Sequence, residues 1–347
     1  MSKQRAILHV GLHKTGSTAI QESAFLNRGL LLESGLYYPD YTPVWKKDVR
    51  AHHAFAHSLS DAGGRFSGSD LLLLVERWHQ FCRNTGSSLF LSSESWSWHR
   101  DASFSDDWFS QRGSYLKRLR TLLGGFNVTV VLVLRRQDFY TKALYKEYVM
   151  KGTPRGSVGF PEFIDACKTR VLRFFDSIRM YQSTFDEIVI LTYEDLCENG
   201  SLVRSFFERI GVECVSFLDV GKVRESLSDV ESVLKCRLNQ VYGAGCRNAD
   251  MLRWLKCDAT KEAIDMLMCG RRFDYWNVEN RPGFLSLFEK ENRDIAQTCF
   301  DRDCLFAEVV GAQENDITIG EILDSLIPAD VESMFVRCEE QRPDLDF

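Results

Sequence analysis

The stretch RAILHVGLHKTGSTAIQ, residues 5–21, decides the fold that we expect for this chain. An apolar run at residues 6–10 meets a glycine, a loop of small residues follows, and the next segment has helical spacing. This order predicts a strand, a loop and a helix. Backbone N–H groups at the start of such a helix bind a multiply charged anion, and glycines in the loop let the anion approach the backbone closely.

The loop differs from an ordinary nucleoside-triphosphate loop in the position of its lysine. The ordinary loop reads G-x-x-x-x-G-K-[ST], with the lysine after the second glycine and the next hydroxyl on Mg²⁺. Gly11 and Gly16 have this spacing, but Ser17 and Thr18 follow the second glycine, and Lys14 stands inside the loop. A lysine in that position lies beside the anion, where a leaving oxygen would gain charge.

With its lysine inside the loop, the stretch resembles the 5′-phosphosulfate loop of bacterial sulfotransferases that use 3′-phosphoadenosine 5′-phosphosulfate (PAPS). The resemblance implies a P-loop-type fold and PAPS as co-substrate, without a metal. It also implies transfer of a sulfuryl group to a hydroxyl or amine, with Lys14 as the catalytic residue that neutralises the leaving phosphate. The loop residues that would bind the donor are Gly11, His13, Lys14, Thr15, Gly16, Ser17 and Thr18.

A second anion-binding motif follows residues 128–134, the run of the chain richest in β-forming residues. Arg135 leaves this predicted strand at its carboxyl end, where α/β sheets bind ligands, and arginine binds phosphate with a two-pronged geometry. The segment is similar to the 3′-phosphate segment of sulfotransferases, in which a serine follows the arginine eight residues later. Ala143 stands there instead. Without the serine, the hydrogen bond from its hydroxyl to the 3′-phosphate is lost. This loss costs about 1.5–3 kcal/mol unless water or Lys142 replaces the hydroxyl.

Further segments extend the resemblance over the predicted core and, in patches, over the second half of the chain. Arg224 lies in one of these patches and is predicted to be a further donor-binding residue. The matching segments are residues 35–39, 52–53, 92–94, 134–138, 224–228 and 288–296.

Sulfuryl transfer also needs a base that takes the proton of the acceptor. Glu94 follows the predicted strand at residues 88–92, at the end where sulfotransferases place catalytic side chains. His52 and His53 lie in a region from which related enzymes draw their base. We favour Glu94, then His53, then His52, and the choice among them stays open.

Strands expected at residues 6–10, 88–92, 128–134 and 188–191 alternate with helical patterns along the chain. This alternation predicts an α/β fold with a P-loop-type central parallel sheet flanked by helices. Residues 1–218 are expected to form the PAPS-binding core. Residues 219–347 are expected to form a helical C-terminal extension packed on it. The longer helices are expected at residues 17–34, 71–83, 108–123, 137–151, 170–183, 228–241, 248–268 and 285–299.

The composition of the chain bears on which partners it can bind and on the compartment in which it works. The 347 residues carry a net charge of −6, which disfavours a general nucleic-acid surface. No apolar run approaches the ~20 residues of a membrane span, and no targeting segment is evident. The 11 cysteines include no C-x-x-C pair, which predicts reduced thiols in the cytoplasm. His53 and His57 lack the H-E-x-x-H pattern, so no metal site is expected.

Two other functions stay open. One is a P-loop kinase or nucleoside triphosphatase, against which the position of Lys14 and the lack of an evident Mg²⁺-binding aspartate after an apolar run both argue. The other is a catalytically degenerate nucleotide-binding protein, which the alanine at position 143 keeps open. The acceptor, whether a small molecule, a carbohydrate or a lipid, and the oligomeric state cannot be deduced from the sequence.

Overall fold

The computed structural model describes residues 3–60, 63–97, 107–213, 226–307 and 313–327. The chain forms two compact units, each built from several segments. Unit 1 contains residues 1–136, 170–223 and 291–306, and unit 2 contains residues 137–169, 224–290 and 307–347. The domain boundary expected after residue 218 lies outside the described residues, and so does Arg224.

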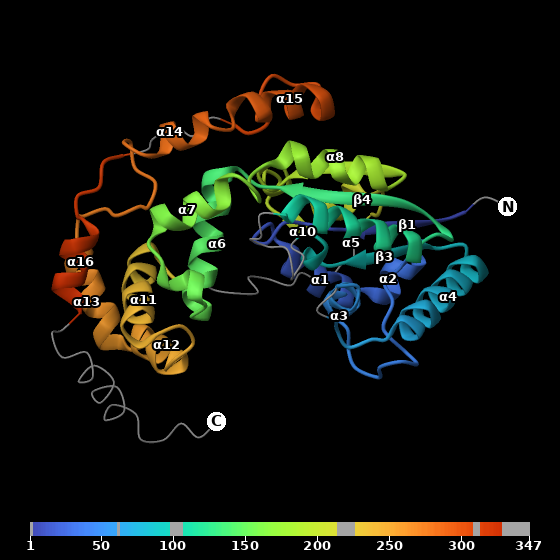
Figure 1. The fold of residues 1–347 in the computed structure, drawn as a ribbon, viewed down its shortest axis with the longest axis horizontal. Helices are drawn as coiled ribbons and strands as arrows, with labels where there is room; N and C mark the ends of the chain where they lie inside the picture. Colours follow the sequence, from blue (N-terminus) through green and yellow to red (C-terminus); the bar gives the residue numbers. More distant parts are fainter. Residues whose placement is uncertain (1–2, 61–62, 98–106, 214–225, 308–312, 328–347) are drawn as a thin grey trace. The chain divides into compact units, whose positions relative to one another are not determined.

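Unit 1 is built on a five-stranded parallel sheet with the strand order β2-β3-β1-β4-β5. Figure 1 labels its three central strands, β3, β1 and β4. Its strands are β1 (Gln4–His9), β2 (Leu36–Tyr37), β3 (Ser88–Ser92), β4 (Phe126–Leu134) and β5 (Glu187–Thr192). All of the neighbouring strands pair in parallel. The structure therefore confirms the α/β class with a parallel central sheet and many helices.

The strands of the sheet form at buried or half-buried, apolar stretches of the sequence, and β4 and β5 are also rich in β-branched residues. β4 is buried along its whole length except at Asn127, as expected for a parallel strand that is covered on both faces. β1 lies between β3 and β4, and Leu8 is paired with Leu91 on one side and Val130 on the other. The chain fills the β2-β3 side before the β4-β5 side, so the order reverses at β1. Such a reversal point is where open α/β sheets bind ligands.

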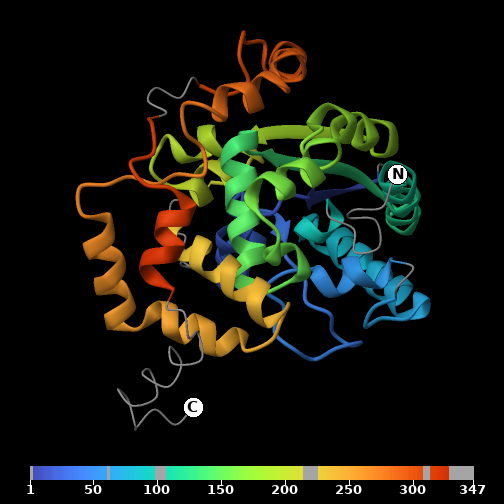
Figure 2. The same ribbon diagram turned by 60° about the vertical axis from the view of Figure 1, so that its left-hand side comes forward.

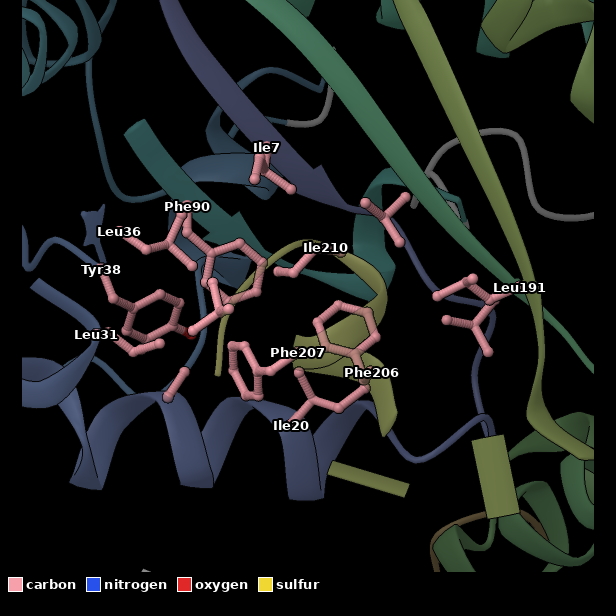
Figure 3. Close-up of a cluster of buried hydrophobic side chains, with 14 of the residues drawn as sticks. Ile7, Ile20, Leu31, Leu36, Tyr38, Phe90, Leu191, Phe206, Phe207 and Ile210 are labelled. Atoms are coloured by element: carbon pink, nitrogen blue, oxygen red, sulfur yellow. The ribbon is translucent and has the colours of Figure 1, made fainter. Parts of the chain in front are cut away.

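One face of the sheet packs against α1 (Ser17–Leu26), α2 (Arg28–Glu33) and α10 (Leu202–Arg209). Figure 3 shows Phe206 and Phe207 of α10 between the strands and Ile20 of α1. Successive strand residues point to opposite faces, so β1 presents Ile7 and His9 to this side. The ring of His9 contacts Phe206, with centroids 4.7 Å apart.

Three other helices of unit 1 also pack on the strands or on one another: α4 (Gly68–Thr85), α5 (Trp108–Leu122) and α8 (Phe174–Thr184). α4 contacts β1 and β3, and α8 contacts β5. α5 contacts both α4 and α8 (Figure 2). α4 begins with a capping box, in which Ser67 and Asp70 satisfy each other's backbone N–H groups. The shorter elements that lie wholly in unit 1 are α3 (His53–Ser58), the 3₁₀ turn η1 (Glu94–Trp96) and α9 (Tyr193–Cys197).

Unit 2 consists of helices and loops over its described residues. The buried ion pair between Arg281 and Asp138 joins two of its helices, with Nη2 and Oδ2 2.6 Å apart. Its elements are α6 (Gln137–Lys151), η2 (Pro154–Ser157), α7 (Phe160–Lys168), α11 (Asp229–Tyr242), α12 (Asn248–Lys256), α13 (Asp258–Met268), α14 (Arg281–Ser286) and α16 (Ile319–Leu326); α15 (Glu289–Phe300) begins in it and continues in unit 1. No helix in the described ranges has the length and apolar character that crossing a bilayer requires.

Three helices expected as single elements are broken. Residues 17–34 divide at Asn27, whose side-chain amide donates to the carbonyl of Ser23 at 2.8 Å and so competes with the helical backbone. Residues 248–268 divide at Cys257, which has extended backbone angles. Residues 285–299 divide between Ser286 and Glu289. Apolar spacing continues across each break, so the pattern alone does not reveal it.

Replacing Phe206 by alanine is expected to destabilise the fold by about 3–5 kcal/mol, because this ring is fully buried in the core beneath the sheet. Leu72→Ala is the control, since Leu72 is 59% exposed and its loss should change stability by less than about 0.5 kcal/mol. Urea unfolding of both variants measures the difference. Equal stability of the two variants would contradict this packing.

Candidate functional site

The loop after β1 is anchored at its beginning, at Val10. The backbone N–H of Val10 donates to the carbonyl of Val131 on β4 at 3.0 Å, and the hydroxyl of Ser97 donates to the carbonyl of Val10. Within the loop, Thr15 Oγ1 donates to the carbonyl of Leu12 at 2.6 Å. The helix that follows begins directly after the loop, so its first N–H groups lie at the carboxyl edge of the sheet. This is the strand, loop and helix arrangement that the sequence predicts.

The conformation of Gly16 favours glycine, and its surroundings leave little room for a side chain. Its φ of +81° is in the left-handed region, which glycine adopts without strain. A Cβ atom on Gly16 would lie 2.5 Å from Cδ1 of Leu202 on α10, so a side chain would collide with the neighbouring helix. The second glycine of the motif therefore lets α1 and α10 pack closely at the loop.

Lys14 also has a positive φ, 64°, which is strained for a residue with a side chain. Arg135 stabilises this conformation, because its Nη1 donates to the carbonyl of Lys14 at 2.6 Å. The guanidinium also lies over the ring of Tyr193, 4.5 Å from its centroid. The two motifs that the sequence places about 120 residues apart therefore meet at the ends of neighbouring strands.

Two buried polar atoms lie on the inner side of the loop without a hydrogen-bond partner among the described residues. They are Nε2 of His9 and Oγ of Ser17. The other ring nitrogen of His9, Nδ1, is 2.8 Å from the hydroxyl of Ser92 on β3. Burial lowers the pKa of His9 to about 4, so its ring is neutral near pH 7. Unsatisfied buried polar groups are rare and fit a site built to bind a polar ligand.

Glu94 begins the 3₁₀ turn after β3 and is mostly buried. Its Oε2 accepts a hydrogen bond from Nε2 of Gln21 on α1 at 2.8 Å and lies 3.6 Å from Nε2 of His53. Burial by itself raises the pKa of Glu94, but the charges of His53 and His13 and the hydrogen bonds hold it below its usual value. Glu94 is therefore ionised at neutral pH.

The two neighbouring histidines have different roles in the structure. Both ring nitrogens of His52 bond to backbone: Nδ1 accepts from the N–H of Ser92 at 3.1 Å, and Nε2 donates to the carbonyl of Pro39 at 3.2 Å. The ring is buried, and burial lowers its pKa to about 3. His53 is partly exposed, and its Nδ1 lies 2.9 Å from the hydroxyl of Ser93. His53 faces Glu94, whereas His52 fastens the backbone.

The lysines of α6 are paired with carboxylates inside unit 2. Nζ of Lys142 lies 3.1 Å from Asp229 and 2.9 Å from Asp274, and Nζ of Lys146 lies 2.9 Å from Asp229. Burial lowers the pKa of Lys142, but the two aspartates outweigh this effect and raise it. These lysines stabilise a helical packing, so the structure gives no support to Lys142 as the replacement for the hydroxyl missing at Ala143.

Unit 1 thus contains the whole predicted loop, Arg135 and all three candidate bases, while the predicted role of Arg224 falls outside the described residues. His9 and Gln21 were not among the predicted site residues. Gln21 follows Ser17 by four residues, one helical turn, which was an available signal. No sequence pattern singles out His9 as a site residue. The function of a polar residue in an apolar strand depends on the residues that pack beside it in the folded chain.

No group of three or more His, Cys, Asp or Glu side chains that could hold a metal occurs among the described residues. Comparison of the chain with protein-family models gives no match, and comparison with curated proteins gives none either. The geometry of the site is therefore the basis for a functional proposal.

Replacing His53 by alanine is expected to raise the pKa of Glu94, because the variant loses the largest of the effects that lower it while burial remains. In the wild type, ionised Glu94 stabilises the fold above the usual glutamate pKa, and this contribution is lost as the pH falls. NMR titration of the isotope-labelled carboxyl group measures the shift. His57→Ala is the control, since His57 contacts Ser95 at 3.4 Å and is not among the groups that lower this pKa. A fall in the pKa of Glu94 on removing His53 would refute the pairing.

Proposed function

We propose that this chain is a PAPS-dependent sulfotransferase with a P-loop-type fold. The observation that carries the proposal is the position of Lys14. This residue lies in the loop at the reversal point of a parallel sheet, and its carbonyl accepts a hydrogen bond from Arg135 at the end of the neighbouring strand β4. A triphosphate loop would have its lysine after the second glycine, where Ser17 stands.

In this proposal the donor binds with its phosphosulfate over the start of α1. The backbone N–H groups of residues 13–17 and the positive end of the helix would attract the 5′-phosphosulfate. Arg135 would bind the 3′-phosphate from the neighbouring strand. Its Nε has no hydrogen-bond partner among the described residues, so the guanidinium retains a donor for this purpose. Arg224 and Thr18 are included as further donor-binding residues.

Sulfuryl transfer breaks the bond between sulfur and the bridging phosphate oxygen and forms a bond from sulfur to the acceptor. The leaving oxygen gains negative charge, and the ammonium group of Lys14 would stabilise it. By analogy with phosphoryl transfer, catalysis consists mainly of positioning and charge stabilisation. The strained backbone of Lys14 supports this role, since such strain is concentrated at functional sites.

We assign the base to Glu94. Gln21 and His53 both contact Oε2 and so orient the carboxylate, which would accept the proton of an acceptor hydroxyl or amine. His53 then stabilises and orients the carboxylate, while both ring nitrogens of His52 are engaged by backbone groups. The acceptor belongs to the broad class of small molecules, carbohydrates and lipids.

The cysteines support a reducing compartment. The nine cysteines of the described residues are all free thiols, as expected for a protein that works in the cytoplasm. We include a cytoplasmic location in the proposal on this ground.

Thermal unfolding with ligands tests the proposal directly, because a ligand that binds only the native state raises its melting temperature. Adenosine 3′,5′-bisphosphate at about 100 times its Kd is expected to add about 2.7 kcal/mol, a shift of several degrees. ATP with and without Mg²⁺ is the comparison. A larger shift with ATP and Mg²⁺ would favour a kinase. Tight bisphosphate binding without transfer to any acceptor would favour a degenerate nucleotide-binding protein.

Lys14→Ala is expected to lower the transfer rate by about 100-fold or more, because the leaving phosphate loses its stabilising charge. Transfer of label from radioactive PAPS to a panel of phenols, sugars and lipids measures the rate. Lys46→Ala, at an exposed lysine outside the loop at residues 11–18, is the control and should retain the wild-type rate. Retention of more than about a tenth of the rate by Lys14→Ala, a barrier change under ~1.4 kcal/mol, would refute the role of Lys14.

A further inference from the structure

Three polar side-chain atoms converge on the space next to Gly11. A Cβ atom built on Gly11 would lie 2.7 Å from Nε2 of His9, 2.9 Å from Oγ of Ser17 and 3.2 Å from Oγ1 of Thr15. Any side chain at position 11 would therefore separate His9 from Ser17. The glycine keeps open the space through which these two side chains can meet.

Thr15 already has a partner in the carbonyl of Leu12, but the other two atoms do not. Nε2 of His9 and Oγ of Ser17 are both buried and have no hydrogen-bond partner within the described part of the chain. Both residues are more than nine-tenths buried. A rotation about the Cα–Cβ bond of Ser17 moves its hydroxyl relative to the ring. Leaving two such atoms unsatisfied costs free energy, which a bound ligand can recover.

We infer that His9 is a positioning residue of the donor site, the middle member of a hydrogen-bond chain that runs from Ser92 through His9 and Ser17 to an oxyanion of the bound ligand. The hydroxyl of Ser92 donates to Nδ1 of His9. Nε2–H of His9 donates to Oγ of Ser17. The hydroxyl of Ser17 then donates to a phosphate oxygen over the start of α1.

All of the donors in this chain point toward the anion. Hydrogen bonds aligned in this way polarise one another and strengthen the last bond, most of all in a buried, low-dielectric place. The chain needs a neutral imidazole with one N–H group. Burial keeps the ring of His9 neutral at pH 7, against a smaller opposing effect from the charge of Glu94. A charged imidazole would carry a proton on Nδ1 and could not accept from Ser92.

This inference rests on the proposed function for the identity of the ligand, but its chemistry is that of any phosphate group in the loop. The test is a double-mutant cycle on affinity for adenosine 3′,5′-bisphosphate, measured by calorimetry with wild type, His9→Asn, Ser17→Ala and the double variant. Each single change is expected to weaken binding about tenfold. The double variant is expected to be weaker than wild type by about tenfold as well, because both changes break the same chain. A loss of about a hundredfold, the product of the two, would overturn the inference.

Two substitutions at position 9 separate this role from a merely structural one. The side-chain amide of glutamine can stand near the position of Nε2, whereas that of asparagine stands near Nδ1. We expect His9→Gln to retain affinity within about threefold and His9→Asn to lose it. If His9 only fastens β3 through Ser92, the asparagine variant keeps affinity and the glutamine variant loses it. That result would overturn the inference.

Nitrogen NMR of isotope-labelled histidine in the wild-type protein needs no substitution and covers the case in which a variant fails to fold. The bound state is expected to show His9 as the neutral ring with its proton on Nε2. A proton on Nδ1 would overturn the inference. Inorganic pyrophosphate is the second probe. If pyrophosphate binds and the bisphosphate does not, the proposed function is refuted, and the double-mutant cycle is measured with pyrophosphate instead. If neither pyrophosphate nor the bisphosphate binds, both the inference and the proposed function are overturned.

Discussion

The bond between Arg135 and the carbonyl of Lys14 is the interaction on which the site depends. It exists because β1 and β4 pair in parallel, so that the loops after both strands leave the sheet at the same edge. It fixes a lysine in a left-handed conformation that the residue would otherwise avoid. The positive φ and the hydrogen bond both occur at Lys14, and together they hold this lysine within the loop that follows β1.

Helix α1 connects the two halves of the proposed chemistry. Its first turn carries Ser17 beside the loop, and its second turn carries Gln21, which orients Glu94. The position of the helix is set by Gly16, which has no side chain to keep α10 and its Leu202 away. A shift of α1 would therefore move the loop at residues 11–16 and the carboxylate of Glu94 together. Such coupling suits a reaction that needs donor and acceptor aligned within a fraction of an ångström.

The sequence predicts the parallel sheet and the strand–loop–helix arrangement at residues 5–21 well, because both follow from local rules. A buried parallel strand must be apolar throughout, and a loop that binds an anion needs glycines at particular positions. It does not predict which of His52 and His53 faces Glu94, since both are polar residues in one short segment. That distinction comes from Pro39 and Ser92, whose backbone groups engage His52 in the folded chain. Partners distant in sequence also decide the roles of His9 and the lysines of α6.

The distribution of charge partners is compatible with the proposed anion site in a chain of net charge −6. Lys142 and Lys146 are next to aspartates, so their positive charge is neutralised within unit 2. The contacts of Arg135 are of another kind, a carbonyl oxygen and an aromatic ring, and neither of these carries a net charge. Burial raises the pKa of the nearby carboxyl group of Glu194, and the charges of Arg135 and Arg136 oppose this shift. In the proposed function, the guanidinium of Arg135 attracts a phosphate locally, whatever the net charge of the whole chain.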